Sequence, residues 1–257
     1  LWTERAIREA DAGADYFSTG VKILAEEHGI DRPAFLKQAK VAARAFREHA
    51  VWLRGELSLR RSPFKPAGTE AFDRYLHKGH FLPASQTTEW WFDYAHAELI
   101  EATLEMKELA KSIDWKRSWQ EQLGELPTHH PTAENYYQTF GDVWTTSRQQ
   151  AIDADLVTWP DFPINFVPIP RSDRQASKAL YYLYYRCPPP FGYHDSHQYF
   201  VPPCDPDMSP EEQEAVLRST NDAQIKLNHV VHHAGLGHHV QNYNAFRAES
   251  RVGQMAG

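Results

Sequence analysis

The sequence predicts a mainly α-helical protein with a small β-element near residues 162–201. Long stretches carry apolar residues at spacings of three and four, which is the period of an amphipathic helix. A short, proline-rich stretch at residues 162–170 is better suited to a strand than to a helix. Hydrophobic residues make up 42% of the 257 residues and aromatic residues 13%, which is ample for a packed core.

Two long helices are expected at the start of the chain. The buried face of the first carries apolar residues at helical spacing, namely Ile7, Ala10, Ala14, Phe17, Val21 and Leu24. Gly29 is expected to end this helix, and Asp31 occupies the position of an N-cap before Pro33. The second helix is then expected to reach about Leu57.

Two further helices and three short strands are expected in the middle of the chain. Residues 60–68 and 79–85 are connectors, and helices are expected at about 88–113 and 133–154 on either side of a break at 127–131. Residues 162–170 are predicted to form an edge strand. Residues 180–186 and 198–201 are expected to be additional strand pieces.

The last helix has the clearest start. Ser209 is a predicted N-cap, Pro210 takes the first helical position, and Glu212 completes a capping box. Apolar residues at helical spacing carry this helix to about residue 239, and the residues near the end of the chain also have a helical pattern.

Bulk properties exclude several classes of protein. The net charge is −7 and no run of Lys and Arg is long enough to follow phosphates, so nucleic acid is not an expected partner. No segment reaches the roughly 18 apolar residues that span a bilayer. The first residues are charged, unlike a signal peptide, and two cysteines do not make a disulfide framework. A reduced, cytoplasmic protein is therefore favoured over a secreted one.

Five of the fourteen histidines lie within residues 229–239. Histidine is a common metal ligand, because a neutral imidazole offers one lone pair while its other nitrogen is held by a neighbour. His229 and His233 are four residues apart and share a helix face, whereas His232 and His239 would lie about 10 Å apart on a straight helix. Gly235 and Gly237 provide a break that would fold the later histidines back. A purely structural cluster is the alternative.

The stretch His232-His233-Ala234-Gly235-Leu236-Gly237-His238-His239-Val240-Gln241 resembles the motif His-Glu-Ala-x-Pro-Gly-His-His, followed by a Gln, of domain-of-unknown-function family 885. This bacterial family belongs to the zincin-like superfamily of metallopeptidases. Weaker similarities precede the motif in the same order, at residues 68–76, 104–106, 167–170, 184–190 and 199–201. Together they cover roughly residues 68–257.

The resemblance implies a helical zincin-like architecture and a divalent transition metal, with zinc favoured and iron or manganese possible. By this resemblance His232 and His238 are the best metal ligands and His239 the next. The family's Glu, a general base, is replaced by His233, and its Pro by Leu236. His233 is therefore the expected acid/base, although it lacks a carboxylate's negative charge.

Further candidate residues lie on both sides of the cluster. His229 and Glu249 are other possible ligands, and Glu249 is alternatively an ion-pair partner of Arg247 or Arg251. Those two arginines could bind a substrate carboxylate or form surface ion pairs. His194, His197 and Tyr199 are candidates for substrate binding, and an empty polar loop is the alternative for this segment.

These observations predict a metal-dependent enzyme, most simply a hydrolase of an amide, a peptide or a related small acyl substrate. A metal-dependent enzyme of non-hydrolytic chemistry and a non-catalytic binding relative of a metallopeptidase are the alternatives. The expected partners are a small-molecule or peptide substrate and a second polypeptide.

Domain organisation follows from the same resemblance. Residues 1–257 are expected to form one helical domain, the N-terminal part of a longer one. Residues 1–66 could instead form a helical hairpin before a family-like region at 67–257. Because the family's later Glu ligand, in a Glu-Gly-Trp-Ala motif, does not occur here, cleavage of a precursor after Gly257 is expected. The C-terminal piece would then remain bound as a second chain.

Overall fold

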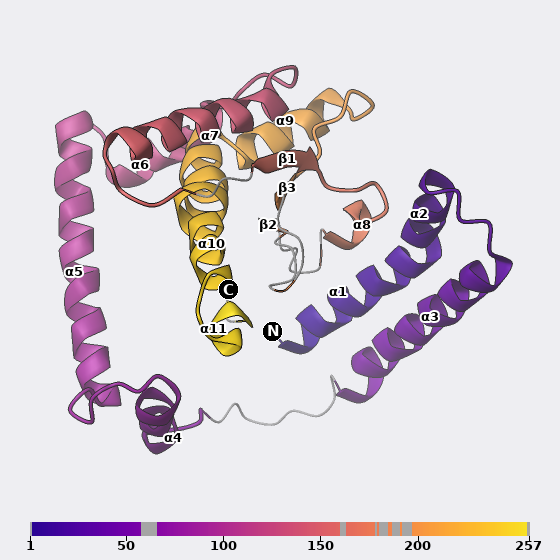
Figure 1. The fold of residues 1–257 in the computed structure, drawn as a ribbon, viewed down its shortest axis with the longest axis horizontal. Coiled ribbons are helices and arrows are strands. Elements are labelled where there is room, and N and C mark those ends of the chain that lie inside the picture. Colours follow the sequence, from indigo (N-terminus) through magenta and orange to yellow (C-terminus); the bar gives the residue numbers. More distant parts are fainter. Residues whose placement is uncertain are drawn as a thin grey trace. The chain divides into compact units, whose positions relative to one another are not determined.

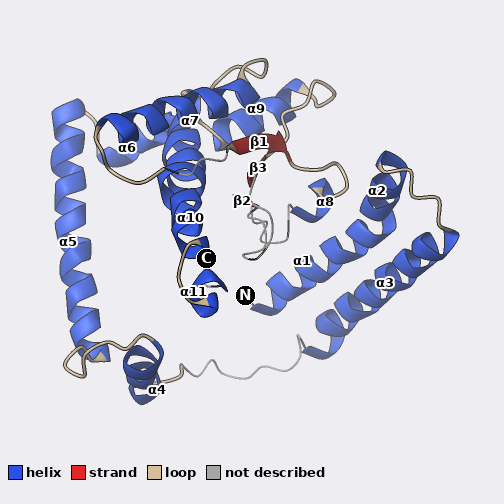
Figure 2. Cartoon of the chain, viewed as in Figure 1, coloured by secondary structure: helices blue, strands red, loops and turns tan. Residues whose placement is uncertain are grey.

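The computed structural model describes residues 2–57, 66–159, 163–177, 179, 185–186, 191 and 197–255. The chain is mainly α-helical with one small sheet, which confirms the predicted fold class (Figures 1 and 2). It divides into two compact units, one combining Leu1–Arg60 with Leu126–Gly257 and the other comprising Arg61–Glu125. Among the described residues, no helix combines the length and the apolar composition required to cross a membrane.

The first unit begins with a helical hairpin. One arm joins α1 (Trp2–Asp15), the π-helical turn η1 (Tyr16–Gly20) and α2 (Val21–Glu27), and the other joins α3 (Pro33–Trp52) to η2 (Leu53–Leu57). Gly29 ends the first arm with a positive φ of 60°. The N-cap of α3 is Arg32 and not Asp31, because Pro33 occupies the first helical position.

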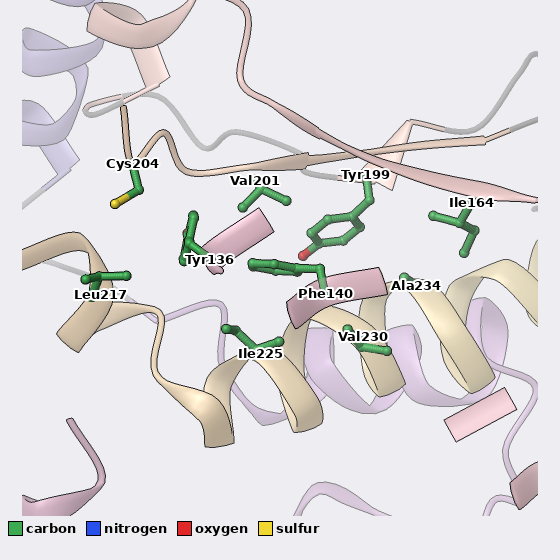
Figure 3. Packing of buried hydrophobic residues seen from close by; sticks show 10 residues of the cluster. All are labelled: Tyr136, Phe140, Ile164, Tyr199, Val201, Cys204, Leu217, Ile225, Val230 and Ala234. Atoms are coloured by element: carbon green, nitrogen blue, oxygen red, sulfur yellow. The ribbon is translucent and has the colours of Figure 1, made fainter. Parts of the chain in front are cut away.

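The core of the first unit lies between a three-stranded sheet and two helices (Figure 3). The strands are β1 (Ile164–Pro168), β2 (Tyr185–Arg186) and β3 (His197–Val201), in the order β1-β3-β2. β1 pairs parallel to β3, and β2 pairs antiparallel to it, so β1 is an edge strand as predicted. The core consists of Tyr136, Phe140, Ile164, Tyr199, Val201, Cys204, Leu217, Ile225, Val230 and Ala234.

Helix α7 (Tyr136–Asp153) and the π-helix η5 (Gln224–His239), whose turns are wider than those of an α-helix, pack against each other beneath this sheet. The short elements α8 (Arg174–Ser177) and η4 (Leu126–Thr128) belong to the same unit. α8 contacts the N-terminal hairpin, where the carbonyl oxygen of Ser172 approaches Gly20 so closely that a Cβ there would lie 2.2 Å away. Glycine therefore permits this contact.

The predicted last helix is in fact four helices. These are α9 (Pro210–Ser219), η5, α10 (Val240–Phe246) and α11 (Arg251–Met255). The capping box of Ser209 and Glu212 is confirmed. The helix nevertheless ends at Thr220, because the side chain of Asn221 accepts a hydrogen bond from the backbone N–H of Gln224 at 3.1 Å and begins a new helix.

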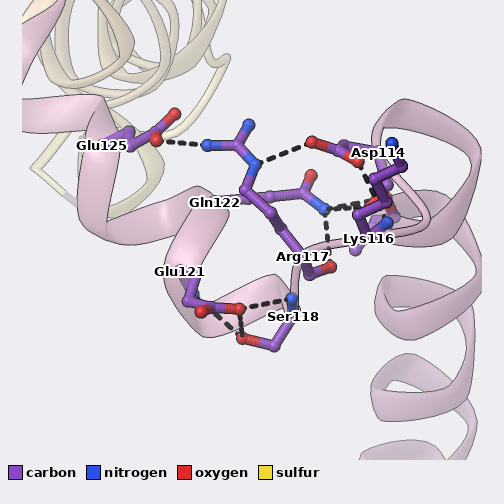
Figure 4. A network of polar contacts seen from close by, with 8 residues as sticks. Asp114, Lys116, Arg117, Ser118, Glu121, Gln122 and Glu125 are labelled. Atoms are coloured by element: carbon purple, nitrogen blue, oxygen red, sulfur yellow. Dashed lines mark hydrogen bonds and ion pairs between the residues drawn. The ribbon is translucent and has the colours of Figure 1, made fainter.

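The second unit contains α4 (Thr69–Arg74), η3 (Tyr75–Gly79), α5 (Thr88–Ile113) and α6 (Trp119–Glu125). The sequence prediction missed α6, whose start is marked by Ser118 and Glu121, spaced as in a capping box. Figure 4 shows the polar network that joins α6 to the end of α5. In it the Gln122 amide donates hydrogen bonds to the backbone carbonyls of Ala110, Asp114 and Arg117.

Candidate functional site

The histidine motif lies where η5 breaks and continues as α10. The break is at Gly237, whose φ of −85° and ψ of −112° are not helical. A Cβ on Gly237 would lie 1.6 Å from the carbonyl oxygen of His232, so every residue larger than glycine would overlap the backbone. The expected interruption of the helix is thus present, and it places His238 beside the turn that carries His232.

Three imidazoles of the motif form a compact cluster. The ring centroids of His232 and His233 are 4.4 Å apart in a stacked arrangement. The ring of His238 lies 5.4 Å from that of His232 and 5.5 Å from that of His233. Because His238 is separated from the other two by the break at Gly237, the bend of the chain is what assembles this histidine triad.

Gln241 orients one member of the histidine triad. Its side-chain oxygen accepts a 2.7 Å hydrogen bond from Nδ1 of His238. Since an amide oxygen can only accept, Nδ1 carries the proton, and the lone pair of the neutral ring is on Nε2. A partner that fixes the tautomer in this way is typical of metal-binding histidines.

His233 is the most enclosed member of the triad. Burial, and then the neighbouring His232 and His238, hold the pKa of His233 below its usual value. Its Nδ1 atom is buried and has no hydrogen-bond partner. A neutral imidazole at pH 7 with an unpartnered buried nitrogen is costly, and a ligand that engages this nitrogen would remove the cost.

His229 lies one turn before the triad, in the core. Its Nδ1 is 2.7 Å from the hydroxyl oxygen of Tyr199, and both side chains are buried. Burial, and secondarily the nearby His233, lowers the pKa of His229 to about 4, so this ring is neutral at pH 7. Tyr199 has no exposed surface and lies among the core side chains (Figure 3), and its hydroxyl reaches His229 instead of solvent.

His239 faces a different environment from His238. Its ring is fully buried and lies 4.9 Å from the ring of His197 on β3, with the two Nδ1 atoms 3.2 Å apart. Trp144 of α7 packs edge-on against it at 5.8 Å. His197 and His239 therefore form a buried pair that joins the sheet to η5, apart from the triad formed by His232, His233 and His238.

The spacing of the triad can be compared with that of zinc ligands. Two imidazoles bound to one tetrahedral zinc at about 2.0–2.1 Å would have their ring centroids roughly 5 Å apart. The observed 4.4–5.5 Å brackets this value. Within the described ranges, however, no group of three or more His, Cys, Asp or Glu side chains is placed to hold a metal ion as it stands. The rings are close enough for shared ligation, but binding would require rotation of their side chains.

The remaining candidate residues are dispersed. His194 lies outside the described residues. Glu249 is exposed in the bend between α10 and α11. The helix is therefore interrupted between His238 and Glu249, and the two residues do not share a helix face. Arg247 donates a hydrogen bond to the Tyr243 hydroxyl, and Arg251 lies over the ring of Phe191 at 5.2 Å. The two arginines thus do not share one helix face.

An open pocket of about 610 Å³ lies along α7 and the strand β1, and none of the three triad histidines lines it. Trp144 lines this pocket and packs against His239, and a Cβ at Gly235 would lie 3.3 Å from its ring. Gln198, Asn165 and Asp142 contribute polar groups to its wall. Gln241 belongs to the motif that the sequence already singled out, whereas Trp144 is far from the histidines in sequence and is placed beside His239 only by folding.

Comparisons with known proteins bear on the fold. No known family model matches the chain, and no curated protein matches it in sequence, so the resemblance to family 885 stays a prediction. The structure is similar to that of a protein from Shewanella oneidensis described as "a putative lipoprotein of unknown function", with a TM-score of 0.61 and 18% identity. The match covers 93% of this chain and 44% of that protein, so this chain spans less than half of its structural neighbour.

Proposed function

We propose that the protein is a metal-dependent enzyme in which His232 and His238 hold a divalent transition metal. The observation that carries this proposal is the break at Gly237, which brings three imidazoles from two separate turns within 5.5 Å of one another. A glycine that admits no side chain, positioned where it folds one histidine onto others, supports a functional bend over a merely structural one.

Each neighbour of the proposed ligands has a defined part. Gln241 holds the Nδ1 proton of His238, so that Nε2 is the nitrogen that would bind the metal. His233, which is neutral at pH 7, is the group that would accept a proton from a bound water. A bound zinc ion would polarise a substrate carbonyl and lower the pKa of that water.

Hydrolysis of an amide, a peptide or a related acyl compound is the reaction class we propose. It rests on the resemblance of the motif to zincin-like metallopeptidases. Replacement of the family's Glu by His233 favours, as the second candidate, a metal-dependent reaction other than hydrolysis. A binding relative without catalysis is the third.

Two imidazoles are fewer than the three protein ligands usual at catalytic zinc. This supports the proposal that a second polypeptide contributes a further ligand, such as a carboxylate. Denaturing mass spectrometry of the purified, active protein is expected to show two species. A single species at 29.6 kDa with full activity would contradict that part of the proposal.

Metal binding is tested with the purified protein, including any polypeptide that copurifies with this chain, and added zinc, manganese or iron(II). We expect zinc to raise the melting temperature, and His232→Ala or His238→Ala to weaken binding by about tenfold or more. His28→Ala, in an exposed turn of the N-terminal hairpin, is the matched control and should bind as the native protein does. Equal binding by all four proteins, or no binding by any, would rule out the site.

Catalysis is tested separately, by comparing the zinc-loaded protein with His233→Ala on a peptide library. We expect hydrolysis by the native protein and a rate reduced by about 10²-fold or more in the variant. Equal rates would remove His233 from the mechanism. Metal binding without hydrolysis of any peptide would shift the assignment to the non-hydrolytic or non-catalytic alternatives.

A further inference from the structure

Helix α5 of the second unit is long and poorly buried. It spans 26 residues, or about 39 Å, and Ala110 is its one buried residue. Large apolar side chains on this helix are nevertheless exposed, among them Phe92 at 71%, Leu99 at 64% and Ile113 at 69%. Soluble proteins rarely leave so many apolar side chains of one helix exposed unless the surface binds something.

Four of the exposed apolar side chains of α5, with the half-buried Met106 and two exposed alanines, follow a heptad pattern, whereas Trp90, Tyr94, Ile100 and Leu104 are exposed on other faces of the helix. Phe92, Leu99, Met106 and Ile113 are seven residues apart, and Ala95, Ala102 and Leu109 follow them at the intervening spacing of three. These seven residues, the α5 seam, form one continuous stripe of the kind that packs against another helix. At its N-terminal end the seam opens into an apolar pocket of about 630 Å³, which Phe92 and Ala95 share with Trp91 and Tyr75.

An acidic stripe borders the α5 seam. Glu98, Glu101 and Glu105 lie at spacings of three and four, so they are neighbours on the helix surface and repel one another. In the described part of the chain none of the three forms an ion pair, whereas Glu108 is paired with Lys111. A positively charged partner would relieve this repulsion.

Size and charge together argue against a second copy of this helix as the partner. In a parallel pair Ala95 and Ala102 would face their own copies and leave gaps. An antiparallel pair would bring Glu98 near Glu105 of the other copy, and facing like charges are unfavourable. The small side chains of Ala95 and Ala102 leave room for large apolar side chains of a different helix. The acidic stripe beside the seam would pair with Lys or Arg on that helix.

We infer that the α5 seam binds a basic amphipathic helix of another polypeptide. Large apolar side chains of that helix would fill the layers at Ala95 and Ala102 and enter the pocket at Phe92. Its Lys or Arg side chains would lie along Glu98, Glu101 and Glu105. This inference does not depend on a metal at the histidine triad, because all of its residues belong to the second unit.

The test uses the full chain and a labelled synthetic 26-residue peptide with Leu at the heptad core positions and Lys at the flanking ones. We expect saturable binding by fluorescence anisotropy, weakened by salt because the flanking contacts are ionic. Two control peptides are a scrambled peptide of the same composition and a peptide with the same Leu seam but Glu flanks. Each should bind at least about tenfold more weakly. Equal binding of the three peptides would overturn the inference.

Matched variants of α5 locate the surface. Leu99→Ser removes one exposed leucine from the seam and should weaken peptide binding by about tenfold. Leu104→Ser removes an exposed leucine from the opposite side of the helix and should leave binding unchanged. The double variant Glu98→Gln/Glu105→Gln should show a smaller preference for the Lys-flanked peptide over the Glu-flanked peptide. An equal effect of Leu99→Ser and Leu104→Ser would refute the assignment.

Two other outcomes would also overturn it. A dimer of the chain in analytical ultracentrifugation that Leu99→Ser abolishes would show that the seam binds a second copy. A melting temperature of the peptide-free monomer that falls with Leu99→Ser but not with Leu104→Ser would show that the chain itself already covers the seam. The inference expects a monomer and equal melting temperatures.

Discussion

At the scale of single residues, the environment of each histidine decides its chemistry. His229 is buried, lies next to His233 and contacts the Tyr199 hydroxyl, whereas His232 on the following turn is exposed. The two residues are three positions apart and of the same type. Their difference arises because one faces the sheet and core, and the other faces away from them.

This difference predicts how stability depends on pH. The pKa of His229 is about 4 in the folded chain and near 6.5 when unfolded, so the unfolded state binds more protons between these values. The free energy of unfolding therefore has its full value above pH 6.5. It decreases by about 3 kcal/mol as the pH falls from 6.5 toward 4. Urea unfolding at several pH values should show this decrease in the native protein and a smaller one in His229→Gln.

His28→Gln is the control for this measurement, because His28 lies in an exposed turn. It should retain the pH dependence of the native protein. A His229→Gln protein whose unfolding free energy falls as steeply as the native one between pH 7 and 4 would show that His229 titrates normally.

At the scale of elements, the geometry of η5 determines whether the histidine triad exists. The helix is wide from Gln224 to His239, and its single non-helical residue is Gly237. Wide helical turns of this kind often occur at functional sites. The position of His238 beside His232 and His233 depends on this one residue.

Gly237→Ala tests that dependence. The added Cβ would overlap the His232 carbonyl, so the backbone must move, and we expect unfolding to become easier by about 2 kcal/mol or more. Zinc affinity should fall together with stability, because His238 would no longer lie against His232. Thermal unfolding and zinc titration by calorimetry provide the two measurements.

Gly141→Ala is the matched substitution, in helix α7 of the same unit. A Cβ there meets nothing within 4 Å, and alanine favours a helix by up to about 1 kcal/mol over glycine. This variant should be as stable as the native protein or more so, with unchanged zinc affinity. If Gly237→Ala behaved in the same way, the bend would not be what assembles the triad.

At the scale of the whole molecule, the N-terminal hairpin belongs to the unit that carries the histidines, although the second unit, Arg61–Glu125, separates the hairpin from the rest of that unit in the sequence. Contacts of α1 and η1 with α8 make this connection, and Gly20 lies directly against the Ser172 carbonyl. Arg174, the first residue of α8, forms an ion pair with Asp205, which joins α8 to the segment after β3. The hairpin is thus attached to the sheet side of the unit through α8.

Gly20→Ala is expected to loosen this attachment. Hydrogen exchange should become faster in residues 2–57 and around α8, because a Cβ at position 20 would lie 2.2 Å from the Ser172 oxygen. Exchange in α7 and η5 should not change. Gly55→Ala, also in the hairpin but with open space around it, should leave both regions unchanged. Uniform loosening of hairpin and core in Gly20→Ala would show that they unfold together.

The sequence by itself determined the features that depend on neighbouring residues. Helix positions follow from apolar spacing, the start of α9 from the Ser209 capping box, and the bend of the motif from Gly237, because each is an interaction within a few residues. The edge strand at 164–168 was predictable for the same reason, since its prolines cannot supply the hydrogen-bond donors of a central strand.

Only the tertiary structure decided which side chains meet. The motif offers both His238 and His239 as ligands, yet one joins the triad and the other pairs with His197, forty-two residues away. Tyr199 was a candidate for substrate contact, but the strand pleat turns it into the core toward His229. Glu249 lost its alignment with His238 because the chain bends after Phe246. Each of these outcomes depends on packing between distant segments, which local sequence patterns do not encode.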